Sequence, residues 1–324
     1  MISLRSLLGT TILVCATTLA GDAVAQSYPT KPIRIIVPFP PGGGAEFRAR
    51  VIGDKLTRSW NQQVVIEARP GADGAIGAEA VAKSAPDGYT LLLNTIGISV
   101  VNPVMYTKLR YDPLEDFAHV SQLTNTTIVL VVSPSLPVQS TKDLIALAKS
   151  KPGQLNYATV ASVYYLVTEM FKLKTGIDMT YVPYKGDTPA IISVMIGETA
   201  MTFAPILALL AHIKGNKLRA LAVASTNRSP SLPDVPTLAE SGVPDFLVST
   251  WIGISAPAAT PREIVAKLSA EIAKIVRMQD VRERLETGGD IIVGSTPEEF
   301  TAFIKADLAK FRNVVKEVNV SRIN

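Results

Sequence analysis

Cysteine is nearly absent from this sequence of 324 residues: the only one, Cys15, lies in an apolar stretch near the start. From residue 26 onward the chain therefore has no disulfide, thiolate metal site or cysteine nucleophile. Histidine is also scarce, because only His119 and His212 occur, far apart and outside any His-Glu-x-x-His spacing. We interpret both histidines as structural and expect neither a metal nor a cofactor.

The sequence also lacks the short motifs of common enzymes. It has no Gly-x-Ser-x-Gly turn, no Walker loop and no Gly-x-Gly-x-x-Gly after a strand. Gly71, Gly74 and Gly77 have the wrong spacing for a dinucleotide, and they favour instead a helix packed closely on a sheet. Pairs of Asp and Glu could hydrolyse glycosides, but the sequence cannot place two together. A hydrolase is therefore kept only as a disfavoured alternative.

Charge is modest, with 19% charged residues, a formal net charge of +4 and a pI near 9.0. The basic residues are scattered, which argues against a nucleic-acid partner. A hydrophobic fraction of 47% is typical of a well-packed globular protein and argues against disorder. About 300 residues suffice for two ordinary domains.

Residues 1–25 have the features of a cleavable secretory signal. Arg5 precedes an apolar run from Leu7 to Ala20, and Ala23-Val24-Ala25 forms an A-x-A cleavage site before Gln26. The apolar run is too short and interrupted for a stable membrane span. We therefore expect an exported, periplasmic protein without a membrane-spanning segment.

The stretch from Ile33 to Glu46 (IRIIVPFPPGGGAE) predicts a buried strand, a Pro/Gly turn and the start of a helix. A helix that begins after glycines presents bare N–H groups at the positive end of its dipole. Such a helix start can bind an anion such as a carboxylate. The alternative is that Gly42 to Gly44 only turn a corner between strand and helix.

Apolar strands alternate with helices along the chain, which predicts an α/β protein with parallel sheets covered on both faces. The first set of elements is expected at 33–37, about 44–59, 63–67, 75–84 and 89–94. A second set has strands expected at 127–133, 155–159, 180–184, 200–204 and 218–224. Its helices are expected at 140–150, 162–173, 188–196 and 206–214. A strand at 249–256 and helices at 261–276 and 297–318 follow an irregular, Pro-rich segment.

This order predicts two lobes with a ligand cleft between them. Lobe 1 is assigned to residues 26–125 and 250–324, and lobe 2 to residues 126–249. The chain crosses between the lobes twice, near residues 123–127 and 249–253, and these two crossings are expected to form a hinge. Ligands bind beyond the carboxyl ends of strands in such sheets, which makes Asn94 and Thr95 candidates for ligand contact.

Several runs together resemble one family: YPTKPIRIIVPFPPGGG, VVIEARPGADGAIGAEAVAKSAPDGYTLLL, VVSPSLPVQSTKDLIALAKSKPGQLNYAT, VPYKG, HIKGNKLRALAVAS and RSPSLPDVPTLAESGVP. They are similar to the tripartite tricarboxylate transporter substrate-binding proteins, the Bug-type (TctC-like) extracytoplasmic solute receptors. The resemblance covers essentially all of the chain after residue 25. It implies a two-lobed periplasmic binding protein of type II (Venus flytrap) with two crossover strands and no catalysis.

The resemblance also implies partners and site residues. The partners are a small organic carboxylate and the permease subunits of a tripartite transporter, and we expect a monomer. A periplasmic sensor subunit that signals to a membrane receptor would have the same cleft, so the sequence does not separate the two roles. The implied ligand-binding residues are Phe39, Gly42, Gly43, Gly44, Ala45, Glu46, Thr159, Ser162, Tyr164, Tyr165, Ala204 and Pro205.

Several of these positions depart from the family pattern. The usual Thr or Ser and Asp after the glycines are replaced by Ala45 and Glu46, and Glu46 could simply complement the helix dipole. Polar groups are lost elsewhere, while apolar and aromatic residues are gained at Phe47, Val163, Tyr164 and Tyr165. An aromatic carboxylate would suit such walls. The alternative is that these side chains face the core.

Overall fold

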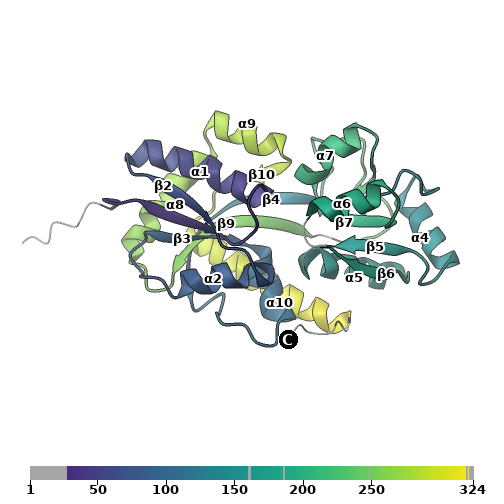
Figure 1. The fold of residues 1–324 in the computed structure, drawn as a ribbon, viewed down its shortest axis with the longest axis horizontal. Helices are drawn as coiled ribbons and strands as arrows, with labels where there is room; N and C mark the ends of the chain where they lie inside the picture. Colours follow the sequence, from purple (N-terminus) through teal and green to yellow (C-terminus); the bar gives the residue numbers. More distant parts are fainter. Residues whose placement is uncertain (1–27, 160–161, 185–186, 247, 319, 321–324) are drawn as a thin grey trace, which may run out of the picture.

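The structure, a computed structural model, describes residues 28–159, 162–184, 187–246, 248–318 and 320. The predicted signal segment 1–25 lies outside these residues. The described chain forms two lobes, joined by two long strands at the centre of one ten-stranded sheet (Figure 1). The strand order is β2-β1-β3-β9-β4-β7-β5-β6, and β8 and β10 also pair with β4.

We use lobe 1 for the half that contains the first three strands. These strands pair in parallel, with β1 in the centre, and are β1 (Ile33–Val37), β2 (Val64–Ala68) and β3 (Thr90–Thr95). The surrounding helices are α1 (Gly44–Trp60), the short 3₁₀ turn η1 (Ala72–Gly74), α2 (Ala75–Ala82) and α8 (Arg262–Val276). The apolar residues of β1 and β3 are almost fully buried, as expected for a sheet covered on both faces, whereas the edge strand β2 is only partly buried and exposes Val65.

Lobe 2 contains the strands β5 (Asn156–Thr159), β6 (Thr180–Pro183), β7 (Met201–Pro205) and β8 (Arg219–Val223). Its helices are α4 (Thr141–Ser150), α5 (Ser162–Thr175), α6 (Asp187–Met195) and α7 (Ile206–Lys214). Strand β5 pairs in parallel with both β6 and β7. The predicted alternation of strands and helices is confirmed here, with boundaries within about two residues.

The two lobes share β4 (Phe117–Val132) and β9 (Ser249–Pro257), which pair antiparallel along residues 117–127 of β4. The sheet is therefore mixed: the first three strands pair in parallel, as predicted for the first set of elements, and the two crossover strands pair antiparallel at its centre. Strand β4 is also much longer than the predicted 127–133. The predicted lobe boundaries at 125/126 and 249/250 fall within these two strands and stay predictions.

After β9 and α8 the chain adds elements that the sequence did not predict, α9 (Gln279–Thr287) and β10 (Asp290–Ile292). Helix α10 (Pro297–Glu317) begins with a capping box between Thr296 and Glu299. Pro297 at its first position is a second signal that favours a helix start there. The π-helical turn η2 (Gly97–Val101) and α3 (Asn102–Met105) follow β3. Apolar residues of α10 join these two elements to the core of lobe 2 in the largest buried cluster.

Candidate functional site

The loop between β1 and α1 forms an open, uncapped helix start. Gly43 is the N-cap of α1 in extended conformation and makes no side-chain capping hydrogen bond. Gly42 has φ +83°, which favours glycine, and a Cβ there would meet nothing within 4 Å. The amides of the first helical turn are therefore available to an anion, as an uncapped helix start allows.

Glu46 folds back onto this loop. One carboxylate oxygen accepts from the Gly42 amide at 2.6 Å and the other accepts from Arg50 Nε at 2.9 Å. The hydrogen bond from Gly42, and then that from Arg50, lower the pKa of Glu46. This placement supports the dipole-complement interpretation of Glu46, and it occupies the Gly42 amide that the sequence assigned to the ligand.

A buried ion pair between Arg48 and Asp290 holds the start of α1 in place. The Arg48 guanidinium donates to both carboxylate oxygens of Asp290 on β10, at 2.7 and 2.6 Å, and its third nitrogen donates to the Gly44 carbonyl at 2.9 Å. Thr126, on the crossover strand β4, donates to Asp290 at 2.6 Å. This network links the β1–α1 loop to the crossover strand β4. None of these contacts was predicted from the sequence, because the partners lie up to 242 residues apart.

Gly44 lies at a close approach between the lobes. A Cβ there would come within 2.8 Å of Arg48 Nη1 and 3.5 Å of Leu207 on α7. Helix α7 begins after Pro205, which also makes no side-chain capping hydrogen bond. The uncapped starts of α1 and α7, one in each lobe, therefore lie near each other. Ala204 is buried at the end of β7, in the core of lobe 2.

Three hydroxyls next to this region have no hydrogen-bond partner in the described part of the chain: Thr95 Oγ1, Thr159 Oγ1 and Tyr184 Oη. Thr95 and Thr159 are the last residues of β3 and β5, and the Tyr184 amide donates to the Thr159 carbonyl at 2.9 Å. Thr159 is only 1% exposed. Buried polar groups are normally paired, so these hydroxyls are open to a partner outside the described residues.

Asn94 differs from its neighbour Thr95. It is fully buried, its amide donates to Ser255 Oγ at 2.9 Å, and its carbonyl oxygen accepts from Ser99 at 2.8 Å. This side chain therefore holds β3 to β9 and to η2. Its position does not support the predicted contact with a ligand.

The aromatic and apolar residues that suggested an aromatic ligand pack within the lobes. Val163 and Tyr164 are buried in the core around α5. The Tyr165 ring packs against Tyr181, with 4.9 Å between ring centroids. Phe47 packs against the core of lobe 1, as does Phe39. These positions match the core-facing alternative that the sequence left open.

Gly77 explains the glycine repeat at the start of α2. A Cβ at Gly77 would come within 2.7 Å of Pro38 Cβ and 2.9 Å of the Arg69 carbonyl. The prediction that these glycines let a helix pack closely on the sheet is confirmed. Asp73 lies in the short turn η1 just before this helix. Its carboxylate accepts a hydrogen bond from Ser162 Oγ, at the start of α5 in lobe 2.

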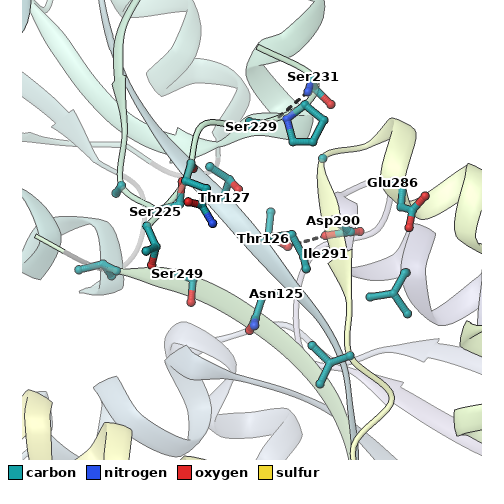
Figure 2. Close-up of a pocket in the computed structure, with 18 of the residues that line it drawn as sticks. Asn125, Thr126, Thr127, Ser225, Ser229, Ser231, Ser249, Glu286, Asp290 and Ile291 are labelled. Carbon is teal, nitrogen blue, oxygen red and sulfur yellow. Dashed lines mark hydrogen bonds between the residues drawn. The ribbon is translucent and has the colours of Figure 1, made fainter. Parts of the chain in front are cut away.

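A separate pocket of about 1030 Å³ lies beside the crossover strands (Figure 2). Its walls come from β4 at Asn125–Thr127, from the loop 224–231 of lobe 2, and from Glu286 and Asp290 of lobe 1. None of the predicted ligand-binding residues lines it. Both lobes therefore contribute walls to this pocket, beside the crossover strands. Asp290 lines it and also forms the buried ion pair with Arg48.

Two classes of site are not found in the described chain. Among the described residues no three His, Cys, Asp or Glu side chains gather as metal ligands would. His119 is buried, and burial lowers its pKa to about 4, so its ring is neutral at pH 7. Over the same residues no helix combines the length and apolar character needed to cross a bilayer.

Comparison with known proteins identifies the family. A family model described as the tripartite tricarboxylate transporter family receptor (TctC) matches residues 48–320. The chain belongs to this family. The two-lobed fold and the Bug-type resemblance drawn from the sequence are thereby confirmed.

Relatives along the whole chain agree with this assignment. Protein BugT of Bordetella pertussis is 38% identical over 309 residues, which are 94% of this chain and 95% of BugT. The structure "R. palustris Rpa4515 with adipate" is 34% identical, with a TM-score of 0.87, and the match covers 91% of this chain and 100% of that one. MatC of Rhodopseudomonas palustris with bound malate is 30% identical, with a TM-score of 0.82 over 89% and 100%.

Proposed function

We propose that this protein is a periplasmic receptor that captures a small organic carboxylate between its lobes. It would present the ligand, as a monomer, to the permease subunits of a tripartite tricarboxylate-type transporter, without catalysing a reaction. The observation that carries the proposal is the uncapped start of α1, close to Leu207 of lobe 2, in a fold where Thr95 and Thr159, at strand ends of the two lobes, have unpartnered hydroxyls. Helix-start amides and hydroxyls are strong donors to a carboxylate.

Relatives support the carboxylate class. Two similar structures are described with adipate and with bound malate. Other similar structures are described as a periplasmic transporter and as the periplasmic binding protein BugD, which supports export through the predicted signal at residues 1–25. The proposed ligand seat comprises the amides of Gly43, Gly44 and Ala45, the hydroxyls of Thr95 and Thr159, and the start of α7 after Pro205. Ser162 borders this seat, because its hydroxyl hydrogen is donated to Asp73.

The aromatic ligand stays a prediction. The described packing of Phe47, Val163, Tyr164 and Tyr165 removes the observation that favoured it. Aliphatic acids, with lengths between those of malate and adipate, fit a seat made of amides and hydroxyls. An aromatic acid such as benzoate belongs in the same binding panel as a direct comparison.

Thermal unfolding with and without added acids tests the proposal. At about 100 times its Kd a ligand should add about 2.7 kcal/mol to the free energy of unfolding. We expect adipate, malate or a related aliphatic acid to raise Tm, and uncharged amides of the same acids to leave it unchanged. If no carboxylate in the panel raises Tm, the receptor proposal is wrong; if only benzoate does, the aromatic prediction is correct.

Uptake by cells tests the transporter role separately. Deleting the gene should abolish accumulation of the radiolabelled acid that raises Tm, and restoring the gene should recover it. Normal accumulation, together with loss of a transcriptional response to the acid, would instead support the sensor role.

A further inference from the structure

Asp73 is held in a fixed position at the edge of the cleft in lobe 1. It lies in the 3₁₀ turn η1 with φ 50°, a left-handed conformation that Asp tolerates better than most residues. Its carbonyl accepts from the buried Asn102 amide at 3.0 Å, and its carboxylate accepts from the Tyr106 hydroxyl at 3.4 Å. Burial and then the charge of Asp73 raise the pKa of Tyr106 to about 12, so this hydroxyl stays a donor.

The Asp73 carboxylate reaches across to lobe 2. Its Oδ2 accepts from Ser162 Oγ at 2.5 Å, at the first residue of α5. Ser162 lies three residues after Thr159, whose hydroxyl belongs to the proposed seat. On the lobe 1 side, Asp73 precedes Gly74, where a Cβ would lie 3.3 Å from Pro38 Cβ in the β1–α1 loop. Asp73 therefore links the turn beside the β1–α1 loop in lobe 1 to the start of α5 in lobe 2.

The charge of Asp73 has no basic partner among the described residues, since no ion pair between them includes it. Glu46, the other acid beside the seat, is by contrast paired with Arg50. A partly buried negative charge in a carboxylate-binding cleft repels a second carboxylate placed close to it. It attracts a hydroxyl or ammonium group, because hydrogen bonds to a charged acceptor are strong.

We propose that Asp73 is a specificity-determining residue, which selects carboxylates that carry a hydrogen-bond donor, a hydroxyl or an ammonium group, at the end facing η1. The amides and threonine hydroxyls would hold the carboxylate, and Asp73 would accept from the donor. Specificity here is a difference between two affinities, in which the repulsion of a second carboxylate matters as much as the new hydrogen bond. This inference rests on the proposed carboxylate-binding function.

Matched ligand pairs and a charge-removing substitution test the role of Asp73. Calorimetric titration would compare 6-hydroxyhexanoate with adipate, and malate with succinate. We expect the intact protein to bind the member with the additional hydroxyl at least about tenfold more tightly in the pair that fits the cleft. Asp73→Asn should reduce this ratio to within about threefold. In the first pair it should do so mainly by strengthening adipate, whose second carboxylate the Asp73 charge repels. In the second pair, where both members are dicarboxylates, it should do so mainly by weakening malate.

Two further variants control for folding and for net charge. Asp73→Gly suits the left-handed backbone and should show the same loss of discrimination with an unchanged Tm. Asp54→Asn changes the same charge on the exposed middle of α1 and should keep the ratio of the intact protein. Equal binding of both members by the intact protein, or a ratio that Asp73→Asn leaves unchanged, would overturn the role of Asp73 while leaving carboxylate binding intact. Absence of binding for all four acids would overturn the proposed function itself.

Discussion

In lobe 1 the proposed seat consists mainly of backbone: the amides at the start of α1, exposed by glycines and held by the buried Arg48–Asp290 pair, together with the Thr95 hydroxyl. In lobe 2 it includes the Thr159 hydroxyl at the end of β5, and Ser162 at the start of α5 donates to Asp73 of lobe 1. Backbone amides bind any carboxylate, whereas side chains such as Thr159 and Asp73 distinguish one acid from another. Changes at the α1 amides should therefore alter affinity for all ligands, and changes at Thr159 or Asp73 should alter selectivity.

The largest effect is expected from removing the Arg48–Asp290 ion pair in lobe 1. Arg48→Met leaves the Asp290 carboxylate buried without its ion-pair partner, which should lower the free energy of unfolding by about 3–5 kcal/mol. Chemical denaturation would measure the loss. Arg50→Met removes a surface partner of Glu46 and serves as the control, with a much smaller expected loss because that pair is exposed to solvent.

A second substitution checks the cause of that loss. Combining Arg48→Met with Asp290→Asn removes the buried charge and should recover part of the stability. If the double variant is no more stable than Arg48→Met alone, the Arg48–Asp290 contact stabilises through packing rather than through charge pairing.

An intermediate effect is expected from one substitution in each half of the seat. Gly43→Val places a branched side chain in the open space over the amides, and Thr159→Val removes one hydroxyl while keeping the shape. Each should weaken binding of the acid that raises Tm by about tenfold or more, equivalent to about 1.4 kcal/mol. Tm of the unliganded protein should change little, because a Cβ at Gly43 would meet only the Pro40 carbonyl, at 3.8 Å.

The comparison between lobes gives these two variants different signatures. Gly43→Val should weaken all bound acids by a similar factor, while Thr159→Val should weaken them unequally. Unchanged affinity in both variants would contradict the placement of the seat between α1 and α5.

The smallest effect is expected at Glu46. Hydrogen bonds from Gly42 and Arg50 lower the pKa of its carboxyl group, so its stabilising contribution is present at neutral pH and is lost as the pH falls through the lowered pKa. Glu46→Gln should lower Tm slightly at pH 7, with a smaller difference from the unchanged protein in acid, and should alter ligand affinity less than Gly43→Val. A loss of binding as large as that of Gly43→Val would show that Glu46 contacts the ligand.

Sequence patterns predicted most local elements because those elements bury regular apolar faces. The helix at 206–214 and the strand at 33–37 were predicted with the bounds that the structure shows. Strand β4 was predicted only in its apolar second half. Its first half carries buried polar side chains, among them Ser121, whose hydroxyl donates to the Ser295 carbonyl at 2.7 Å, a partner distant in sequence. Helix α9 was missed because its sequence offers only Val281 and Leu285 as buried residues.

The sequence by itself determined the strand–glycine–helix unit at residues 33–60, the α/β alternation and the family. It could do so because glycine conformation, strand burial and helix starts depend on neighbours in the chain. Only the tertiary structure decided that Arg48 pairs with Asp290, that Asp73 meets Ser162, and that Tyr164 faces the core. Those contacts join residues 242 and 89 positions apart, or depend on which face of a helix packs inward, and no local pattern encodes either.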